Sequence, residues 1–211
     1  MNPARVLSRL ASSLFPGACL ACGSRASERE YGFCPRCAPS VVRIHVSPGA
    51  GPFSAVRYEG AVVRALHAFK YEGRMWRARD LAVLLAETWR EAELSADLIV
   101  PVPLAWRKEF CRGYNQSALL SVHLGRLVGV PVALSVLRRA RWTPTQTGLS
   151  AQSREENVRG CFAVRRPACV AGRRLVLVDD VLTTGATCRE AARALRAAGA
   201  AAVVALTVAR V

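Results

Sequence analysis

The sequence predicts an α/β domain, a parallel sheet flanked by helices, preceded by a small N-terminal module that contains four cysteines. From Phe53 onwards, short apolar runs typical of strands alternate with stretches of helical periodicity, which favours a parallel sheet with helices on both faces. Before that point, two C-x-x-C pairs are separated by only eleven residues. We therefore expect two units: residues 1–48 with the cysteines and a linker, and residues 49–211 as the α/β domain.

Composition and charge are compatible with this plan. The 211 residues are enough for one α/β domain with a small appendage, and a hydrophobic content of 52% is enough to build a core. The net charge of +15 favours polyanionic partners such as phosphorylated small molecules or nucleic acid. However, only Lys70 and Lys108 are lysines, and a chain so rich in arginine and alanine is also typical of a genome-wide compositional bias.

The N-terminal segment has neither the length of a membrane span nor the pattern of an export signal. No apolar run approaches the ~20 residues of a transmembrane helix, so we expect no membrane insertion. Residues 4–14 predict a short amphipathic helix, and Arg9, Ser12 and Ser13 interrupt the apolar run that a signal peptide requires. We therefore expect a cytoplasmic protein whose cysteines stay reduced.

Four cysteines form the pattern of a metal site. Each C-x-x-C pair can direct two thiolates at one ion, and two pairs complete a tetrahedral zinc site. The predicted ligands are Cys19, Cys22, Cys34 and Cys37. Because the protein would fill all four positions, the zinc is expected to be structural and to be needed for the module to fold. Disulfides and a redox C-x-x-C pair are the alternatives.

The α/β domain begins with a strand at 53–58 and continues as an alternation of helices and strands. Apolar residues at helical spacing predict the first two helices. Pro101 and Pro103 close the next strand, because proline cannot donate to a sheet ladder. Asn115 is placed to cap the helix that follows. The further predicted elements are helices at 61–69 and 78–94, a strand at 97–104, a helix up to 128, strands at 131–136 and 161–164, a strand from 175, a helix at 186–199 and a strand at 201–209.

The stretch from Arg174 to Thr187 carries the most specific chemistry. Leu175–Val178 is an apolar, β-branched run that suits a strand buried on both faces, and two adjacent carboxylates, Asp179 and Asp180, end it. Buried carboxylates are costly unless something there needs them. A turn of small residues follows and leads into a helix, whose N-terminus offers free backbone N–H groups to a phosphate. The turn residues are Thr183, Thr184, Gly185, Ala186 and Thr187.

This combination fits a ribose 5-phosphate. The vicinal hydroxyls, or a metal, would lie on the two carboxylates, and the phosphate would lie on the turn. The alternatives are an ordinary strand–turn–helix unit and a Walker B strand, for which the chain lacks the partner motif G-x-x-x-x-G-K-[ST].

Two loops complete the predicted site. The strand at 97–104 delivers a basic loop to the edge where α/β sheets bind ligands. Its candidate pyrophosphate-binding residues are Arg107, Lys108, Arg112 and Gly113. A long polar segment, 141–157, is interpreted as a flexible cover over the site, with a solvated connector as the alternative. Its candidate residues are Arg141, Gln146, Arg154 and Asn157.

Taken in order, these features resemble the ComF family of phosphoribosyltransferase-like proteins, which is linked to natural competence in bacteria. The motifs that carry the resemblance are the four-cysteine module, Tyr58-Glu-Gly60, Lys70-Tyr-Glu-Gly73, Val100-Pro-Val-Pro-Leu104, Arg112-Gly-Tyr-Asn-Gln116, the Thr143 to Asn157 segment and Val178-Asp-Asp with its threonine turn. The resemblance implies a type I phosphoribosyltransferase fold with an N-terminal zinc ribbon, which binds phosphoribosyl pyrophosphate (PRPP) with Mg²⁺. Tyr114 is a mild departure, since phenylalanine is usual there.

The resemblance also implies a reaction, the displacement of pyrophosphate from PRPP by an acceptor. Asp179 and Asp180 would hold the ribose hydroxyls, and the threonine turn would hold the 5-phosphate. The sequence has no signature for the acceptor, and a fold does not prove turnover. Three hypotheses therefore stand: a phosphoribosyltransferase, a non-catalytic component of DNA uptake that binds single-stranded DNA or a competence helicase, and a scaffold whose zinc module only caps the domain.

Overall fold

A four-stranded parallel sheet forms the centre of the computed structural model, which describes residues 17–26, 28–49, 51–104, 110, 112–140 and 158–211. The strand order is β3-β8-β7-β4, and all three pairings are parallel. The strands are β3 (Phe53–Arg57), β4 (Leu98–Pro101), β7 (Arg174–Leu182) and β8 (Ala202–Arg210). β7 lies between β4 and β8, but its pairing with β4 ends at Val178, so its carboxyl end from Asp179 onwards pairs only with β8.

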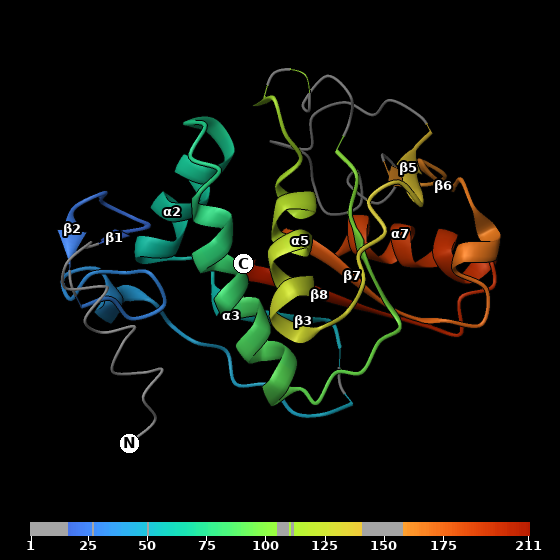
Figure 1. Cartoon of the computed structure of the whole chain (residues 1–211), viewed down its shortest axis with the longest axis horizontal. Coiled ribbons are helices and arrows are strands. Elements are labelled where there is room, and N and C mark those ends of the chain that lie inside the picture. The colour runs from blue at the N-terminus through green and yellow to red at the C-terminus, as the bar shows by residue number, and fades with distance from the viewer. Residues whose placement is uncertain (1–16, 27, 50, 105–109, 111, 141–157) are drawn as a thin grey trace.

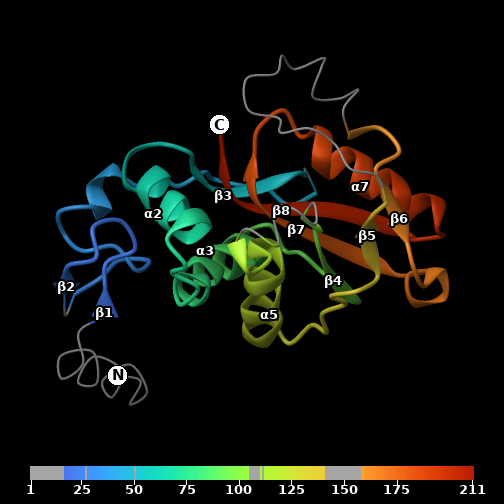
Figure 2. The same ribbon diagram turned by 90° about the horizontal axis from the view of Figure 1, so that it is seen from above.

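Helices cover both faces of this sheet, as the alternation of elements predicted (Figure 1). Figure 2 shows α3 and α5 on one face and α7 on the other. The helices are α2 (Gly60–Tyr71), α3 (Arg77–Glu91), α5 (Gln116–Val128) and α7 (Ala186–Ala197). Each lies within a few residues of the position that the sequence predicted.

Successive residues of β7 divide between two hydrophobic cores. Val176 and Val178 belong to the core with α2, α3 and α5, whereas Leu175 and Leu177 belong to the core with α7. All four side chains are at most 1% exposed. The prediction of a strand buried on both faces is confirmed, and the strand continues through both aspartates to Leu182.

The predicted strand at 131–136 is wrong except at Val132, which makes one parallel bridge to Ile99 of β4. The chain then turns at Leu134, whose side chain is exposed, and leaves the sheet. A strand forms only beyond it, as β5 (Leu137–Arg139). It pairs antiparallel with β6 (Phe162–Val164), the predicted edge strand, in a separate two-stranded sheet.

The segment between the cysteines and the domain is more ordered than the predicted linker. It contains the 3₁₀ turn η1 (Ala38–Ser40) and then runs antiparallel along β3. The N–H of Ile44 donates to the carbonyl of Ala55, and that of Arg57 donates to the carbonyl of Val42. The segment therefore covers an otherwise open sheet edge. The division between residues 48 and 49 stays a prediction.

The cysteine module is built on two very short antiparallel strands, β1 (Gly17–Ala18) and β2 (Arg25–Ala26). The predicted helix at 4–14 lies outside the described residues. In the part of the chain that the structure describes, no helix has both the length and the apolar character to cross a membrane.

Candidate functional site

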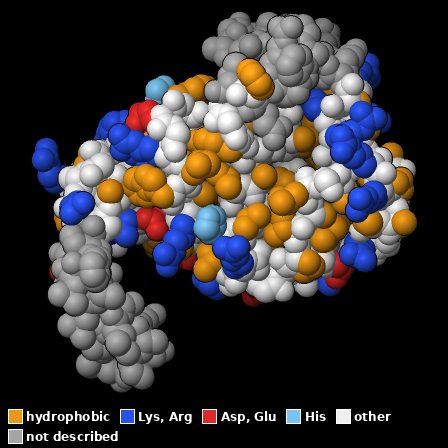
Figure 3. Space-filling view, turned by 45° about the horizontal axis from the view of Figure 1, so that its top comes forward, with side chains coloured by type: hydrophobic (Ala, Val, Ile, Leu, Met, Phe, Trp, Pro, Cys, Tyr) orange, Lys and Arg blue, Asp and Glu red, His pale blue; other side chains and the backbone are white. Residues whose placement is uncertain are grey.

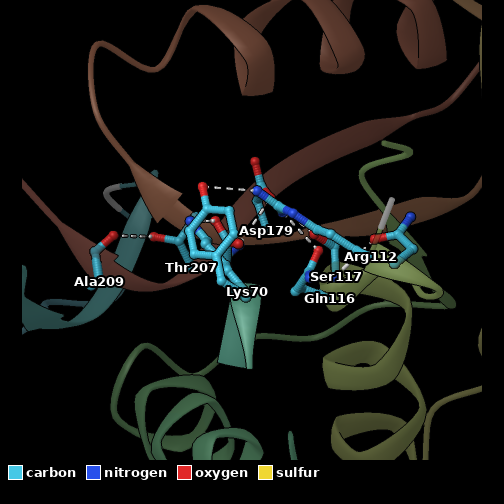
Figure 4. Close-up of polar contacts among 10 residues, drawn as sticks. Lys70, Arg112, Gln116, Ser117, Asp179, Thr207 and Ala209 are labelled. Carbon is cyan, nitrogen blue, oxygen red and sulfur yellow. Dashed lines mark hydrogen bonds and ion pairs between the residues drawn. The ribbon is translucent and has the colours of Figure 1, made fainter. Parts of the chain in front are cut away.

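Asp179 is held at the carboxyl end of β7 by two hydrogen bonds to one carboxylate oxygen. The Ser117 hydroxyl donates to Asp179 Oδ1 over 2.9 Å, and the backbone N–H of Asp180 donates to the same atom over 2.9 Å. Ser117 is in position because Asn115 caps α5 as predicted, accepting hydrogen bonds from the N–H groups of Ser117 and Ala118. The cap thus fixes the first turn of α5 beside the acidic pair (Figure 4).

Asp180 has a different partner, Lys70 from the last turn of α2. The Lys70 Nζ lies 3.0 Å from Asp180 Oδ1, and the two side chains are only 18% and 13% exposed. Asp179 and Asp180 are therefore adjacent in sequence but are fixed by different helices, α5 and α2.

Burial and mutual repulsion set the protonation of this group. Burial, with the charge of Asp180 beside it, raises the pKa of Asp179 to about 7, although the bonds from Asp180 N–H and Ser117 oppose the shift. For Lys70, burial lowers the pKa, but the two aspartates outweigh it and raise the pKa above its ordinary value. Lys70 is thus a firmly charged ammonium beside two crowded carboxylates.

The turn after β7, which the sequence predicts to be a phosphate cradle, leads directly into the N-terminus of α7. Gly185 has a φ of 77°, a left-handed conformation that favours glycine, and it is the N-cap of α7. Thr184 Oγ1 accepts a hydrogen bond from the Ala186 N–H over 3.4 Å, and Arg189 donates to the Thr184 carbonyl over 2.7 Å. The next N–H groups of the first helical turn have no acceptor within the helix. They lie a few residues from the carboxylates, on the same strand–turn–helix unit.

Arg112, from the predicted pyrophosphate loop, also lies at this edge. It donates to Gln116 Oε1 and to the Tyr71 hydroxyl, both over 3.1 Å, and its guanidinium stacks 4.8 Å above the Tyr71 ring. Gly113 follows it with a φ of 75°. Gln116 is buried, and its Nε2 has no hydrogen-bond partner among the described residues.

The remaining predicted site residues lie outside the described part of the chain. These are Arg107 and Lys108 of the pyrophosphate loop and Arg141, Gln146, Arg154 and Asn157 of the predicted cover.

Sequence reasoning assigned no role to three residues that the structure brings to the acidic pair and to Arg112, namely Lys70, Tyr71 and Ser117. Lys70 and Tyr71 had a usable signal, because both lie in the Lys70-Tyr-Glu-Gly73 motif, and Lys70 is also one of just two lysines in a chain with 30 basic residues.

The four predicted metal ligands come together as one cluster. The Sγ atoms of Cys19, Cys22, Cys34 and Cys37 all lie within 4.8 Å of one another, and those of Cys22 and Cys34 are 3.8 Å apart. Tetrahedral zinc with Zn–S bonds of about 2.3 Å requires sulfur separations of about 3.8 Å, so the cluster fits this metal. The cluster could hold a metal ion such as zinc with no position left open for catalysis.

A match to the model of the phosphoribosyl transferase domain covers residues 115–211. This segment contains the acidic pair, the threonine turn and the capped start of α5. Together with the parallel sheet, the match defines a phosphoribosyltransferase-like protein.

Relatives over most of the chain define the family. The chain is 34% identical over 201 residues to the DNA utilization protein YhgH of Escherichia coli strain K12, covering 89% of this chain and 87% of YhgH. It is 39% identical over 141 residues to competence protein F of Haemophilus influenzae, covering 64% of this chain and 61% of that protein. It is also 33% identical over 106 residues to competence protein ComFC of Bacillus subtilis strain 168, covering 50% of this chain and 40% of that protein. The chain belongs to the ComF family, and its match spans less than two thirds of competence protein F and of ComFC.

Solved structures give weaker likenesses. One is the glutamine PRPP amidotransferase of Bacillus subtilis, with a TM-score of 0.43 and 27% identity over 62% of this chain and 25% of that one. Another is the adenine phosphoribosyltransferase of Leishmania donovani, with a TM-score of 0.41 and 14% identity over 80% of this chain and 63% of that one.

Proposed function

We propose that the protein binds PRPP and catalyses the displacement of pyrophosphate by an acceptor, in the cytoplasm of a cell that takes up DNA. The observation that carries this proposal is the juxtaposition of two carboxylates and a phosphate-binding turn on one strand–turn–helix unit. Asp179 and Asp180 would hold the ribose hydroxyls, and the backbone N–H groups and hydroxyls of Thr183–Thr187 would hold the 5-phosphate. Arg112 would contact the pyrophosphate.

The chemistry needs charge placement rather than a covalent nucleophile. Loss of pyrophosphate from the anomeric carbon gives an oxocarbenium-like transition state, which the carboxylates beside the ribose stabilise. Arg112 and the basic loop would carry charge that accumulates on the departing pyrophosphate. The donor set fits Mg²⁺, because carboxylate oxygens are ligands that this ion prefers, and Mg²⁺ would neutralise the pyrophosphate when bound.

Calorimetry with PRPP and Mg²⁺, followed by a pyrophosphate-release assay with a panel of bases and amines, tests the proposal. We expect saturable PRPP binding that Asp179→Asn abolishes, and pyrophosphate release with at least one acceptor. Binding without release for any acceptor would contradict catalysis while leaving donor binding in place.

A second function is favoured by the names of the relatives and by the charge. Competence protein F and DNA utilization protein YhgH point to a role in DNA uptake. Figure 3 shows Lys and Arg side chains in separate groups, mostly towards the edges of one face, and the net charge is +15. In this alternative, the protein is a non-catalytic component that binds single-stranded DNA or a helicase partner, with PRPP as a regulatory ligand. Its affinity for single-stranded DNA should then fall steeply as salt increases, and a flat dependence would exclude this version.

We further propose that the cysteine cluster holds one structural Zn²⁺. Metal analysis of the purified chain should give one zinc per molecule, and a substoichiometric value with intact free thiols would contradict the assignment.

A further inference from the structure

Lys70 occupies a carboxylate oxygen of the acidic pair to which, in the proposed function, the donor or its cation would bind. Its Nζ is 3.0 Å from Asp180 Oδ1, and both side chains are mostly withdrawn from solvent. One oxygen of the neighbouring Asp179 is already occupied by Ser117 and by the Asp180 N–H. An ammonium thus holds a carboxylate oxygen that a ribose hydroxyl or a divalent cation would otherwise contact.

A lysine at position 70 is suited to an ion pair with Asp180 that a ligand can displace. Of the chain's 30 basic residues, only Lys70 and Lys108 are lysines. An arginine would grip a carboxylate through two parallel hydrogen bonds, whereas an ammonium is a compact point charge on a flexible stem. A lysine can therefore neutralise Asp180 and still be displaced by a ligand.

The same helical turn reaches the other side of the site. Tyr71, the next residue, accepts a hydrogen bond from Arg112 and lies under its guanidinium. The end of α2 thus contacts groups assigned to the ribose side and to the pyrophosphate side of the donor.

We propose that Lys70 is the resident counter-ion of the Asp179–Asp180 pair, which keeps free divalent cations off these carboxylates until the phosphorylated donor brings the cation with it. The inference rests on the proposed function for the role of the acidic pair. It makes Lys70 a positioning residue that sets the order of binding: cation alone binds weakly, and cation with donor binds well.

The test measures Mn²⁺ binding to the zinc-loaded full chain without PRPP, by electron paramagnetic resonance. We expect weak binding to the wild type and at least about tenfold tighter binding to Lys70→Met, because a positive charge close to the carboxylates is gone. Lys70→Arg keeps the charge and should leave Mn²⁺ binding in the absence of PRPP as weak as in the wild type. The double variant K70M/D180N should lose the gain, which assigns the new affinity to Asp180. Equal Mn²⁺ affinity in folded K70M and wild type would overturn the proposal.

A measurement on the wild type keeps the proposal testable if K70M does not fold. Amine acylation followed by mass spectrometry reports directly on Lys70, because the chain has only two lysines. With a denatured aliquot as the fully reactive reference, Lys70 should react slowly, and millimolar Mg²⁺ alone should leave its rate unchanged. A rise in Lys70 acylation with Mg²⁺ alone would mean that free cation displaces the ammonium, and the proposal would be wrong.

These results are separable from the proposed function. Calorimetry of the wild type with PRPP and Mg²⁺ tests donor binding, whereas the Mn²⁺ titration tests only the charge balance of the site. If the wild type fails to bind PRPP but K70M gains Mn²⁺ affinity, the role of Lys70 as counter-ion stands and the proposed function is wrong.

Discussion

Single residues at the end of β7 set the charge balance of the site. Two carboxylates and one ammonium share a largely buried volume, so one negative charge is left without a cationic partner among these three groups. The energetic cost of this charge falls mainly on Asp179, because burial and the charge of Asp180 raise the pKa of Asp179 to about 7. A site that costs stability in the free protein is expected where a ligand later supplies the missing interactions.

Asp179→Asn should therefore stabilise the free protein at neutral pH. Because the folded-state pKa of Asp179 lies above the ordinary value of 3.8, the folded protein holds its proton more tightly than the unfolded chain does. Stability from this group is greatest below about pH 4 and is lost as the pH rises towards 7. The variant removes that loss, and we expect its free energy of unfolding at pH 8 to exceed that of the wild type by about 1–2 kcal/mol.

Urea denaturation at pH 5 and pH 8 measures this difference. Asp180→Asn is the matched control, because it leaves the Lys70 ammonium without its carboxylate and should lower stability at both values. If D179N were no more stable than wild type at pH 8, the interpretation of Asp179 as a costly ligand group would be wrong.

At the scale of elements, the unit formed by β7, the turn and α7 depends on one left-handed residue. A Cβ at Gly185 would meet Arg189 Nη1 at 2.9 Å and would also impose a strained φ. Gly172 has a similar φ of 70°, but a Cβ there would meet no other atom within 4 Å, and it precedes the start of β7, away from the site. A comparison of substitutions at the two glycines therefore distinguishes backbone strain, which both would cause, from an effect on the phosphate cradle, which only the change at Gly185 would cause.

Gly185→Ala and Gly172→Ala should both lower the free energy of unfolding by about 1 kcal/mol, because each places alanine in the left-handed region. Only G185A should also weaken PRPP binding, since it moves the N–H groups that the phosphate would contact. Thermal unfolding and PRPP calorimetry on both variants measure these effects. Equal PRPP affinity in G185A and G172A would argue against the turn as the phosphate site.

Across the whole molecule, α2 connects the cysteine cluster to the acidic pair. Arg64 of α2 donates to Cys37 Sγ over 3.9 Å, and Lys70, near the other end of the helix, contacts Asp180. Cys19, Leu20 and Phe33 pack in the same hydrophobic core as the buried residues of α2. The module is therefore placed to do more than cap the chain.

Loss of the metal from the cysteine cluster should therefore weaken ligand binding at the proposed PRPP site. Cys22→Ser is expected to lower zinc content, to reduce the melting temperature by about 5–10 °C and to weaken PRPP binding, because α2 loses part of its support. Cys169→Ser, outside the cluster and half-buried, should retain zinc, stability and affinity. Metal analysis, calorimetric melting and PRPP titration give the three readouts. Full PRPP affinity in zinc-free C22S would instead favour a module that only caps the domain.

Local sequence patterns were enough to predict the parallel sheet, the buried motif strand, the four clustered cysteines and the Asn115 cap. Each depends on periodicity, residue size or the spacing of ligands, and these signals lie within short stretches of the sequence. The same reasoning misplaced the strand at 131–136, because an apolar run does not say which sheet edge it will meet.

The partners of the acidic pair, by contrast, could be assigned only from the three-dimensional packing. Lys70 and Asp180 are far apart in the chain, Ser117 lies 62 residues before Asp179, and no local pattern couples such positions. Their proximity follows because burying the apolar faces of α2 and α5 brings the ends of these helices to the same edge of the sheet. Local chemistry therefore identifies the carboxylates of the candidate site, and the fold supplies the ammonium and the hydroxyl that hold them.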